Sequence, residues 1–584
     1  MTDGARPAIG ARRWAMPDSA RRLLNVAAVL GISATAGAQA AEYYVDAKGS
    51  DANPGTMAQP FASLQKGVDA AVAGDTVYIR GGTYEIVNGA SSMSGVTFAK
   101  SGQSDSKRIN YFAYPGETPV FDFSRLQLSA TATSAGFYVT GSWLHFKGIE
   151  ISHVPMPGTV SNNGLWAVGA SNNIYELLNT HHNSGPGLSI AKGNGGNLVL
   201  NCDSHDNYDA NAAQGAGQNA DGFGCHYQTS GPSTIYRGCR AWWNSDDGYD
   251  LISQEVPVTF ENSWAMGNGT INSGTGRPGS GNGNGFKAGS SKTGVRHVIE
   301  NCLAWKNTAA GFYANHSSGG NTWYNNTSYD NGTQYNMLAS PAGDSSTTIV
   351  LTGSLVHIMR NNIGFPNKNS NMTGVDTASN TWDLNITPAA ADFESVDDSA
   401  FMGPRQADGS LPDIPFMKLK AGSQMIDKGK DVGLPFAGAA PDLGAFEYGA
   451  PAGTESGGGA GQTGGAAGGQ SGGSGGRGGT GGSAVIGAGG GGTGGSAGSG
   501  GNPASGSGGT PAPGTGGQGA GGGATGDSTV TGAAGQGPPG MTDGGGSSGC
   551  ACALATGRPG ALPGALLLAS AGLVTARLRR RRRR

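Results

Sequence analysis

A short motif ending in asparagine recurs through the middle of the chain and limits the fold more than any other feature. Each copy has a short alternating apolar segment, a second short segment and an asparagine before a turn, as in residues 198–208 (LVLNCDSHDNY) and 298–309 (VIENCLAWKNTA). The asparagines are Asn183, Asn207, Asn244, Asn268, Asn307 and Asn331, spaced 24, 37, 24, 39 and 24 residues apart. A period near 24 residues with occasional insertions is typical of a parallel β-helix, whose coils stack about 4.8 Å apart. Stacked asparagine amides can then hydrogen-bond one another along a turn.

Other repeat folds fail specific tests. A β-propeller needs blades of about 40 or more residues built from antiparallel hairpins, and leucine-rich repeats need leucines that this segment lacks. The insertions after Asn207 and Asn268 are expected to form loops on one side of the helix. Cys202, Cys239 and Cys302 occupy equivalent positions, which predicts an inward stack, although a Cys202–Cys239 disulfide between neighbouring coils is geometrically allowed.

Composition divides the 584 residues into four parts. Of 108 glycines, 46 lie between Pro451 and Cys550, where almost no aromatic or β-branched residue could support a core. We therefore expect an all-β body over residues 41–449 and a disordered glycine-rich linker over residues 450–549. A strand, an amphipathic helix around Leu64–Val72 and a strand at Thr76–Arg80 open the body, and the short helix is expected to cap the first coil. Leu411–Tyr448 is expected to form a packed extension.

Both ends of the chain read as targeting segments. Residues 1–40 contain Arg21-Arg22, an apolar run and a small-x-small pattern before Ala41, which predicts an export signal, with a short N-terminal helix as the alternative. Residues 550–584 combine Gly549-Cys550, a short apolar run and a final arginine block. This order resembles the myxobacterial C-terminal sorting signal MYXO-CTERM, which implies cleavage near Cys550, surface display and lipid or membrane anchoring. A plain membrane anchor is the alternative.

Charge limits the partners of the body. Residues 41–449 carry 23 basic and 35 acidic side chains, a net charge near −12, so nucleic acid is excluded as a partner. An acidic polymer would also be repelled unless a bound cation bridges it to the protein. The spacing of the four cysteines of the body matches no zinc site. We expect the protein to be a monomer.

A second repeating pattern follows the asparagine turns and brings charged residues together. Its four copies are Asp221-Gly-Phe-Gly224, Asp247-Gly-Tyr-Asp250, Asn284-Gly-Phe-Lys287 and Ala310-Gly-Phe-Tyr313. The glycine is expected to permit a bend, the aromatic ring to point inward and the next residue to point outward. Stacking then places Asp221 over Asp247 and Asp250 near Lys287, while Asp246 joins from the turn.

Four converging carboxylates cannot all remain ionised without a cation. Asp221, Asp246, Asp247 and Asp250 offer hard oxygen ligands, which suit Ca²⁺ better than zinc or copper. Lys287 beside them is a candidate base with a lowered pKa. The alternatives are ordinary turn aspartates and a simple salt bridge between Lys287 and Asp250.

These motifs, with the opening segment Tyr43–Tyr84, resemble polysaccharide lyase family nine, the calcium-dependent pectate lyases with a right-handed parallel β-helix. The resemblance covers about Ala41 to Tyr448 and implies a calcium site at Asp221, Asp246, Asp247 and Asp250, with Lys287 as the catalytic base. It also implies β-elimination on polygalacturonate or pectin outside the cell. Ca²⁺ would stabilise the charge that develops when Lys287 removes the C5 proton, and activity should favour alkaline pH.

Some alternatives stay open at this point. Arg237, Arg240, Lys292 and Arg296 are candidate contacts for substrate carboxylates or, alternatively, solvated surface charges. A glycoside hydrolase on the same fold would cleave an acidic polysaccharide with paired carboxylates and water. A non-catalytic surface adhesin would use calcium only to stiffen its coils.

Overall fold

The structure, a computed structural model, describes residues 40–269 and 281–450. All of these residues belong to one compact unit of the chain. The expected export signal, glycine-rich linker and sorting segment lie outside the described residues, apart from one boundary residue each for the first two. Within the described ranges, no helix has the length and apolar character needed to cross a bilayer.

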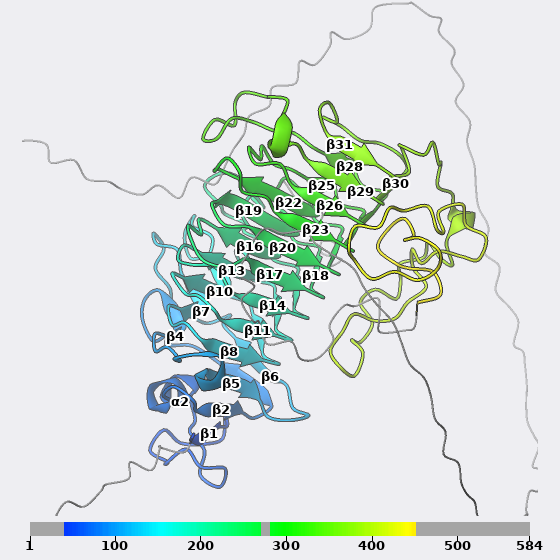
Figure 1. The fold of residues 1–584 in the computed structure, drawn as a ribbon. Coiled ribbons are helices and arrows are strands. Elements are labelled where there is room, and N and C mark those ends of the chain that lie inside the picture. The colour runs from blue at the N-terminus through cyan, green and yellow to red at the C-terminus, as the bar shows by residue number, and fades with distance from the viewer. Residues whose placement is uncertain (1–39, 270–280, 451–584) are drawn as a thin grey trace, which may run out of the picture. The chain divides into compact units, whose positions relative to one another are not determined.

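The described chain winds into a right-handed β-helix whose coils each contribute strands to three parallel sheets (Figure 1). The 12-stranded sheet comprises β1 (Glu42–Val45), β2 (Thr76–Ile79), β5 (Ile109–Ala113), β8 (Leu144–Lys147), β11 (Ile174–Glu176), β14 (Leu198–Leu200), β17 (Thr234–Arg237), β20 (Val258–Glu261), β23 (Val298–Glu300), β26 (Thr322–Tyr324), β29 (Ile358–Arg360) and β31 (Asp376–Ala378). The ten-stranded sheet comprises β3 (Gly82–Glu85), β6 (Pro119–Asp122), β9 (Glu150–Ser152), β12 (Asn179–His181), β15 (Asp203–His205), β18 (Arg240–Trp242), β21 (Trp264–Met266), β24 (Leu303–Trp305), β27 (Thr327–Tyr329) and β30 (Ile363–Phe365). The nine-stranded sheet comprises β4 (Ser94–Phe98), β7 (Ala135–Val139), β10 (Asn163–Val168), β13 (Leu188–Ala191), β16 (Phe223–His226), β19 (Tyr249–Gln254), β22 (Phe286–Ser290), β25 (Ala310–Tyr313) and β28 (Thr333–Asn336).

The predicted asparagine ladder is present and buried. The side-chain amide of each asparagine donates to the side-chain oxygen of the next one, from Asn183 to Asn331, at distances between 2.8 and 3.1 Å. The backbone N–H of each also donates to the same oxygen, as in Asn244 to Asn268 at 3.2 Å. The ladder satisfies polar groups that would otherwise be buried without partners at the turn, so it fixes the spacing of the coils there.

The interior is filled by rows of stacked side chains, as the second pattern predicts. Phe223, Tyr249, Phe286, Phe312 and Tyr335 stack from coil to coil with ring centroids 4.5 to 5.1 Å apart. A glycine precedes every ring of this stack except Tyr335, and it is needed for space: a Cβ on Gly248 would lie 2.7 Å from the carbonyl oxygen of Gly285. The inward stack of Cys202, Cys239 and Cys302 is confirmed, and all three thiols are free, so the allowed Cys202–Cys239 disulfide is not formed.

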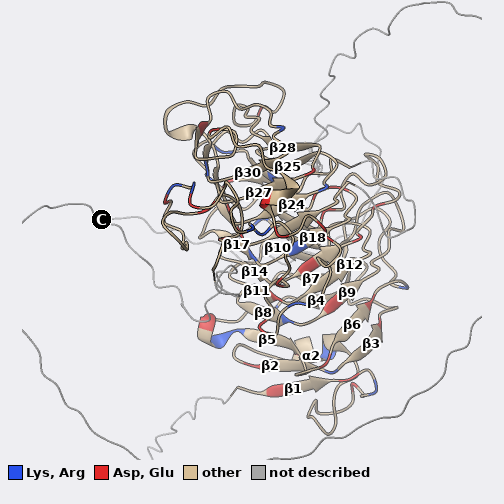
Figure 2. Ribbon diagram, turned by 90° about the vertical axis from the view of Figure 1, so that its right-hand side faces the viewer, with Lys and Arg blue, Asp and Glu red and all other residues tan. Residues whose placement is uncertain are grey.

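A short helix covers the N-terminal end of the solenoid. Helix α2 (Leu64–Ala70) packs on β1, β2 and β4 and buries Leu64, Gly67 and Val68 against them. The hydroxyl of Ser63 caps the helix by accepting from the Lys66 backbone N–H at 3.3 Å. Figure 2 shows α2 close to β2 and β5 at this end, with β3, β6, β9 and β12 following one another above it. The predicted capping helix is therefore confirmed.

The C-terminal extension spans residues 379–450, after β31, so it begins earlier than the expected Leu411–Tyr448, and it packs against the outer face of the ten-stranded sheet. It contains little regular structure beyond the 3₁₀ turn η3 (Ala390–Asp392); two other such turns, η1 (Asp105–Lys107) and η2 (Gly353–Leu355), lie earlier in the chain. Its Phe401, Phe416 and Leu443 join Trp264 and Trp305 of the sheet in a second apolar core.

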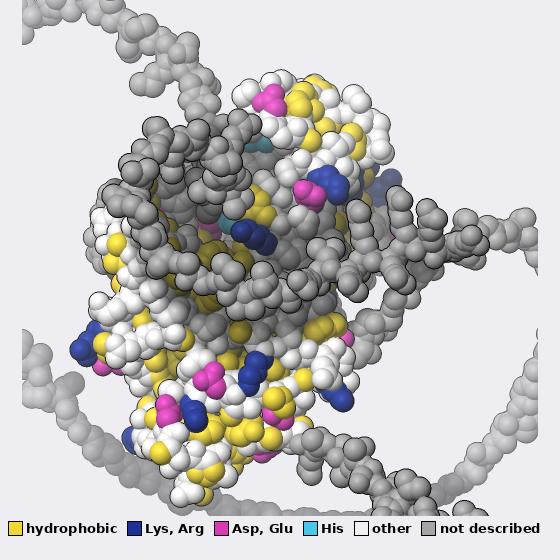
Figure 3. Space-filling view, turned by 90° about the vertical axis from the view of Figure 1, so that its left-hand side faces the viewer, with side chains coloured by type: hydrophobic (Ala, Val, Ile, Leu, Met, Phe, Trp, Pro, Cys, Tyr) yellow, Lys and Arg dark blue, Asp and Glu magenta, His cyan; other side chains and the backbone are white. Residues whose placement is uncertain are grey.

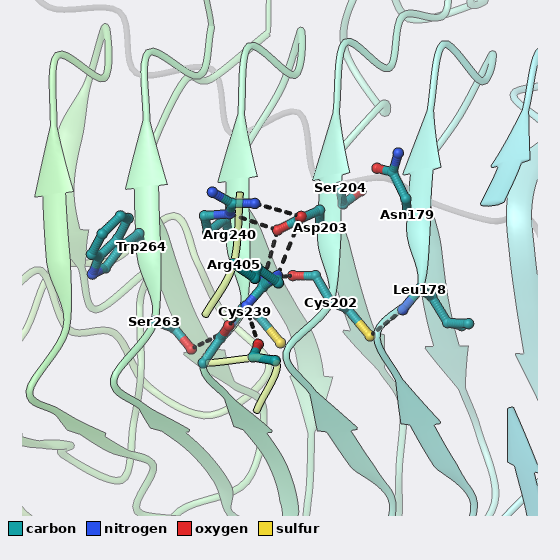
Figure 4. Close-up of polar contacts among 12 residues, drawn as sticks. Leu178, Asn179, Cys202, Asp203, Ser204, Cys239, Arg240, Ser263, Trp264 and Arg405 are labelled. Carbon is teal, nitrogen blue, oxygen red and sulfur yellow. Dashed lines mark hydrogen bonds and ion pairs between the residues drawn. The ribbon is translucent and has the colours of Figure 1, made fainter. Parts of the chain in front are cut away.

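An ion-pair network joins this extension to the sheet. Asp203 lies between Arg240 of β18, at 2.7 Å, and Arg405 of the extension, at 2.6 Å (Figure 4). Arg240 also donates to the backbone carbonyls of Phe401 and Gly403. The expectation that Arg240 is a substrate contact is wrong, because its guanidinium is buried and fully engaged in docking the extension.

Candidate active site

The nine-stranded sheet carries the predicted charged residues on three neighbouring strands. Asp221 precedes β16, Asp246 and Asp247 precede β19, Asp250 lies within β19, and Lys287 lies within β22. The strand registers pair Gly224 with Asp250 and Asp250 with Lys287, as the aligned motifs predict. Both insertions lead into this sheet: residues 206–222 connect β15 to β16, and residues 267–285 connect β21 to β22, with residues 270–280 outside the described chain.

The four aspartates converge on one small region. One oxygen each of Asp221, Asp246 and Asp247 lie within 4.8 Å of one another. Asp221 and Asp250 form a second such group, also within 4.8 Å, with a ring nitrogen of His226. The Asp247 backbone N–H donates to Asp221 Oδ1 at 3.1 Å, which holds the two coils in register. The convergence inferred from the sequence is thus present in the geometry.

Burial makes this cluster electrostatically unfavourable by itself. All four carboxylates are at most 3 % exposed. Burial raises the pKa of each above its ordinary value, and the neighbouring carboxylates raise the pKa of Asp221 and Asp246 further. Lys287 opposes the shift at each aspartate but cannot offset four negative charges. A divalent cation would supply the missing positive charge.

Two asparagines fix the orientation of the carboxylates. Asn284 donates to Asp247 Oδ1 from its backbone N–H, at 2.7 Å, and from its side chain, at 2.8 Å. Asn282 donates to Asp246 Oδ1 in the same two ways, at 2.5 and 3.1 Å. Asp250 Oδ1 is buried and accepts no hydrogen bond from the described residues, and Asp247 Oδ2 is buried 2.9 Å from the Lys287 ammonium. A cation could take these two oxygens as ligands.

Lys287 lies directly against the cluster. Its Nζ is 2.9 Å from Asp247 Oδ2 and 3.4 Å from Asp250 Oδ2, and its side chain is 12 % exposed. Burial lowers the pKa of Lys287, but Asp247, Asp250, Asp246 and Asp221 together raise it well above its ordinary value. These carboxylates favour the ammonium form, so the shift in the pKa of Lys287 runs opposite to the lowering expected from the sequence beside a cation.

His226 is a member of the cluster that the sequence reasoning missed. Its Nε2 lies 3.9 Å from Asp250 Oδ2 and is buried without a hydrogen-bond partner in the described chain. Burial, with Lys287 nearby, lowers the pKa of His226 to about 4, so the ring is neutral. Strand alternation could have found it, since His226 lies two residues beyond Gly224 and faces the same side of the sheet.

The remaining basic candidates lie in other environments. Arg237 pairs with Glu261 at 2.5 Å on the 12-stranded sheet, and Arg296 donates to the backbone carbonyls of Asn321, Ser354 and Val356. Both make structural contacts and neither joins the aspartate cluster, so a role for these two in substrate binding stays a prediction. Lys292 is largely exposed and lies 3.5 Å from Glu255, which fits a surface ion pair.

With the geometry described, comparison with known proteins identifies the family. The model of the family described as Pel9A-like, right-handed beta helix region, matches residues 43–362, more than half of the chain. The chain belongs to this Pel9A-like family. The match includes all four aspartates, His226 and Lys287.

Named relatives share most of their length with the chain. Pectate lyase L of Dickeya dadantii (strain 3937) is 37 % identical over 406 residues, which cover 69 % of this chain and 90 % of that protein. Pectate lyase PEL9 of Emericella nidulans is 33 % identical over 407 residues, covering 65 % of this chain and 92 % of that protein.

Two solved structures have the same fold. The crystal structure of pectate lyase Pel9A superposes with a TM-score of 0.60 at 35 % identity, covering 70 % of this chain and 96 % of that one. A rhamnogalacturonan lyase superposes with a TM-score of 0.59 at 33 % identity, covering 65 % and 96 %. The predicted right-handed parallel β-helix of a polysaccharide lyase family is thereby confirmed.

Proposed function

We propose that this protein is an exported pectate lyase that cleaves polygalacturonate-type chains by calcium-assisted β-elimination, with Lys287 as the base. The observation that carries the proposal is the approach of the Lys287 amine to within 2.9 Å of a four-aspartate cluster on one face of the solenoid. The reaction class rests on the comparisons: the chain is a polysaccharide lyase, because pectate lyases match it over about nine-tenths of their length.

The residues present fit a hard divalent cation. Asp221, Asp246, Asp247 and Asp250 supply only oxygen ligands, and the buried Oδ1 of Asp250 has no hydrogen-bond partner in the described chain. Asn282 and Asn284 each occupy one oxygen of an aspartate and leave the other oriented toward the cluster. Ca²⁺ bound to these residues would act as a Lewis acid that polarises the carboxylate of the substrate.

The chain's own residues then perform the proton transfer. A cation held by the carboxylates would weaken the ion pairs that keep Lys287 protonated, and the neutral amine of Lys287 could then accept the C5 proton of a uronate. As the C5–H bond breaks, its electrons form the C4–C5 double bond and the C4–O bond breaks. The departing oxygen takes a proton from water. Because the aspartates are almost fully buried, this proton transfer takes place in a poorly solvated region.

The polymer that is cut has two candidates. Pectate lyases are named among the relatives, which favours polygalacturonate. The superposing rhamnogalacturonan lyase favours a second candidate, the alternating rhamnose and galacturonate backbone. Both carry the carboxylate beside C5 that the proposed chemistry requires.

Export and display complete the proposal. Cleavage before Ala41 would remove the export signal. Cleavage near Cys550 would leave the body displayed at the cell surface on the glycine-rich linker, where it can meet the polymer. Mass spectrometry of the cell-surface protein should find Ala41 as the first residue. A first residue upstream of Ala41 would contradict the export signal.

Product formation tests the function. The purified protein should release an ultraviolet-absorbing unsaturated uronate from polygalacturonate with calcium and none with a chelator. Lys287→Ala should lower kcat at least about 1,000-fold. Lys292→Ala removes an exposed lysine just beyond the end of the same strand and should match the wild type. Reducing ends without ultraviolet absorption would indicate a hydrolase. Binding without any cleavage would indicate an adhesin, and normal turnover of Lys287→Ala would exclude Lys287 as the base.

A further inference from the structure

An unbroken row of outward-facing positions runs along the nine-stranded sheet through the candidate active site. The strand registers give its members in order as Tyr138, Trp166, Ser189, Gly224, Asp250, Lys287 and Tyr313. Their inward-facing neighbours, such as Phe137 and Leu165, are fully buried in the core. The row therefore lies on the surface that surrounds Asp250 and Lys287.

Two large aromatic side chains stand at one end of this row. Tyr138 of β7 and Trp166 of β10 are both partly exposed, and their rings lie 5.5 Å apart at an angle of 53°. Neither the Tyr138 hydroxyl nor the Trp166 indole N–H bonds to any residue of the described chain. Both are open to solvent, so these side chains present an apolar ring and a free polar group.

The positions between the aromatic pair and the charged cluster are small. Ser189 and Gly224 lie between Trp166 and Asp250 in the row. Both are buried, and their side chains are shorter than those of their neighbours in the row. At about 4.8 Å per coil, Trp166 lies about 14 Å from Asp250 and about 19 Å from Lys287 along the row. Figure 3 looks onto this side of the molecule and shows hydrophobic side chains gathered beside basic and acidic ones.

A basic side chain lies one coil from the aromatic pair. Lys192 is exposed and follows β13, the strand that pairs with the Trp166 strand. No carboxylate of residues 40–269 or 281–450 forms an ion pair with Lys192. Lys192 lies three residues beyond Ser189, the partner of Trp166, or about 10 Å along the strand, so its amine is available to a carboxylate of a ligand that extends past Trp166.

We propose that Tyr138, Trp166 and Lys192 form a distal subsite that binds the same acidic polysaccharide several sugar units from the bond that is cleaved. A pyranose ring stacks its C–H face on the aromatic pair, and Lys192 pairs with a uronate carboxylate. The subsite rests on the proposed function and extends it: the enzyme engages a long polymer along the row and discriminates against short oligomers, which cannot span about 19 Å.

The test compares a long and a short substrate. For Trp166→Ala, the ratio of kcat/KM on polygalacturonate to kcat/KM on trigalacturonate should fall about tenfold, which is the size of one aromatic stacking contact. Tyr324→Ala, which removes a partly exposed ring from the 12-stranded sheet, is the matched control and should keep the wild-type ratio. A wild-type ratio for Trp166→Ala would overturn the subsite and leave the lyase reaction intact. Absence of unsaturated product from the wild type on any uronate polymer would instead overturn the proposed function.

A second variant covers the case in which Trp166→Ala does not fold, as judged by circular dichroism. Lys192→Ala removes an exposed side chain and should lower the same ratio about threefold at low salt, with the difference disappearing at high salt. An unchanged ratio at low salt would likewise overturn the subsite. Calorimetry with octagalacturonate in the Lys287→Ala background should show weaker binding when Lys192→Ala is added, and equal affinities would contradict the subsite.

Discussion

Two aspartates of the cluster are each held by an asparagine that donates to only one carboxylate oxygen. Asp247 shows this most clearly: Asn284 donates twice to Oδ1, while Oδ2 lies 2.9 Å from the Lys287 amine. An asparagine cannot titrate, so its two donors hold the carboxylate in place at any pH. The orientation of Asp246 and Asp247 is thus set by asparagines that are not themselves proposed cation ligands.

Removing the side chain of Asn284 should weaken cation binding without removing a ligand. Asn284→Ala should lower calcium affinity about 10- to 100-fold, because Asp247 loses one of its two anchoring contacts. Isothermal calorimetry with calcium measures the change. Asn371→Ala, which loses an exposed amide contact with Asn336, is the control and should bind calcium like the wild type. Equal affinities for both variants would show that Asn284 does not position Asp247.

At the scale of elements, the asparagine ladder joins coils through buried amides. Asn268 accepts from Asn244 at 3.0 Å and donates to Asn307 at 2.9 Å, and none of the three is exposed. Asn268→Ala would leave both neighbours with unpaired buried groups, and each such group costs about 1–3 kcal/mol. We expect a loss of about 2–4 kcal/mol in the free energy of unfolding, measured in urea.

An exposed asparagine provides the comparison for that loss. Asn367→Ala, on the surface after β30, should change the unfolding free energy by less than about 0.5 kcal/mol. If Asn268→Ala were as stable as Asn367→Ala, the ladder would not stabilise the stack of coils.

A carboxylate on the 12-stranded sheet makes stability depend on pH. Burial, with Glu261 on the adjacent strand, raises the pKa of Glu300 from 4.5 to about 7, while Arg237 opposes the shift. The folded state thus binds this proton more tightly than the unfolded chain, so the group lowers stability as pH rises from about 4.5 through about 7. Glu300→Gln should gain about 1–3 kcal/mol at pH 8 and almost nothing at pH 4, by urea unfolding. An equal gain at both pH values would contradict this assignment.

Periodic features were predictable from the sequence, and contacts between distant segments were not. The rows through Asn244 and Tyr249 follow from short-range spacing, so both the coils and the convergence of the aspartates could be inferred. The pairing of Arg405 with Asp203 joins residues about 200 positions apart that no repeat relates, and Arg240 was misread for that reason. The pKa of Lys287 depends on whether a cation is bound, which spacing does not encode.

For the whole molecule, cation binding should be coupled to stability. The four aspartates come from two adjacent coils, and folding brings their charges together, so a cation bound to the folded state would relieve their mutual repulsion. Calcium at about 100 times its Kd should therefore add about 2.7 kcal/mol to the free energy of unfolding. The melting temperature should rise with calcium and return on chelation, as calorimetry would record.

The variant Asp247→Asn separates this coupling from nonspecific salt effects. It removes one charge from the cluster, so it should unfold at or above the wild-type temperature without calcium and lose most of the calcium-dependent rise. A full calcium-dependent rise in this variant would place the cation elsewhere on the molecule.

The most direct measurement is ultraviolet product formation from polygalacturonate by the wild type, Lys287→Ala and Asp247→Asn, each across a calcium titration. We predict that wild-type turnover rises with calcium to a plateau and increases toward alkaline pH. Asp247→Asn should need far more calcium, and Lys287→Ala should stay inactive at every concentration. Calcium-independent turnover of the wild type, or calcium-dependent turnover of Lys287→Ala, would contradict a mechanism in which neighbouring coils unite a cation site with an amine base.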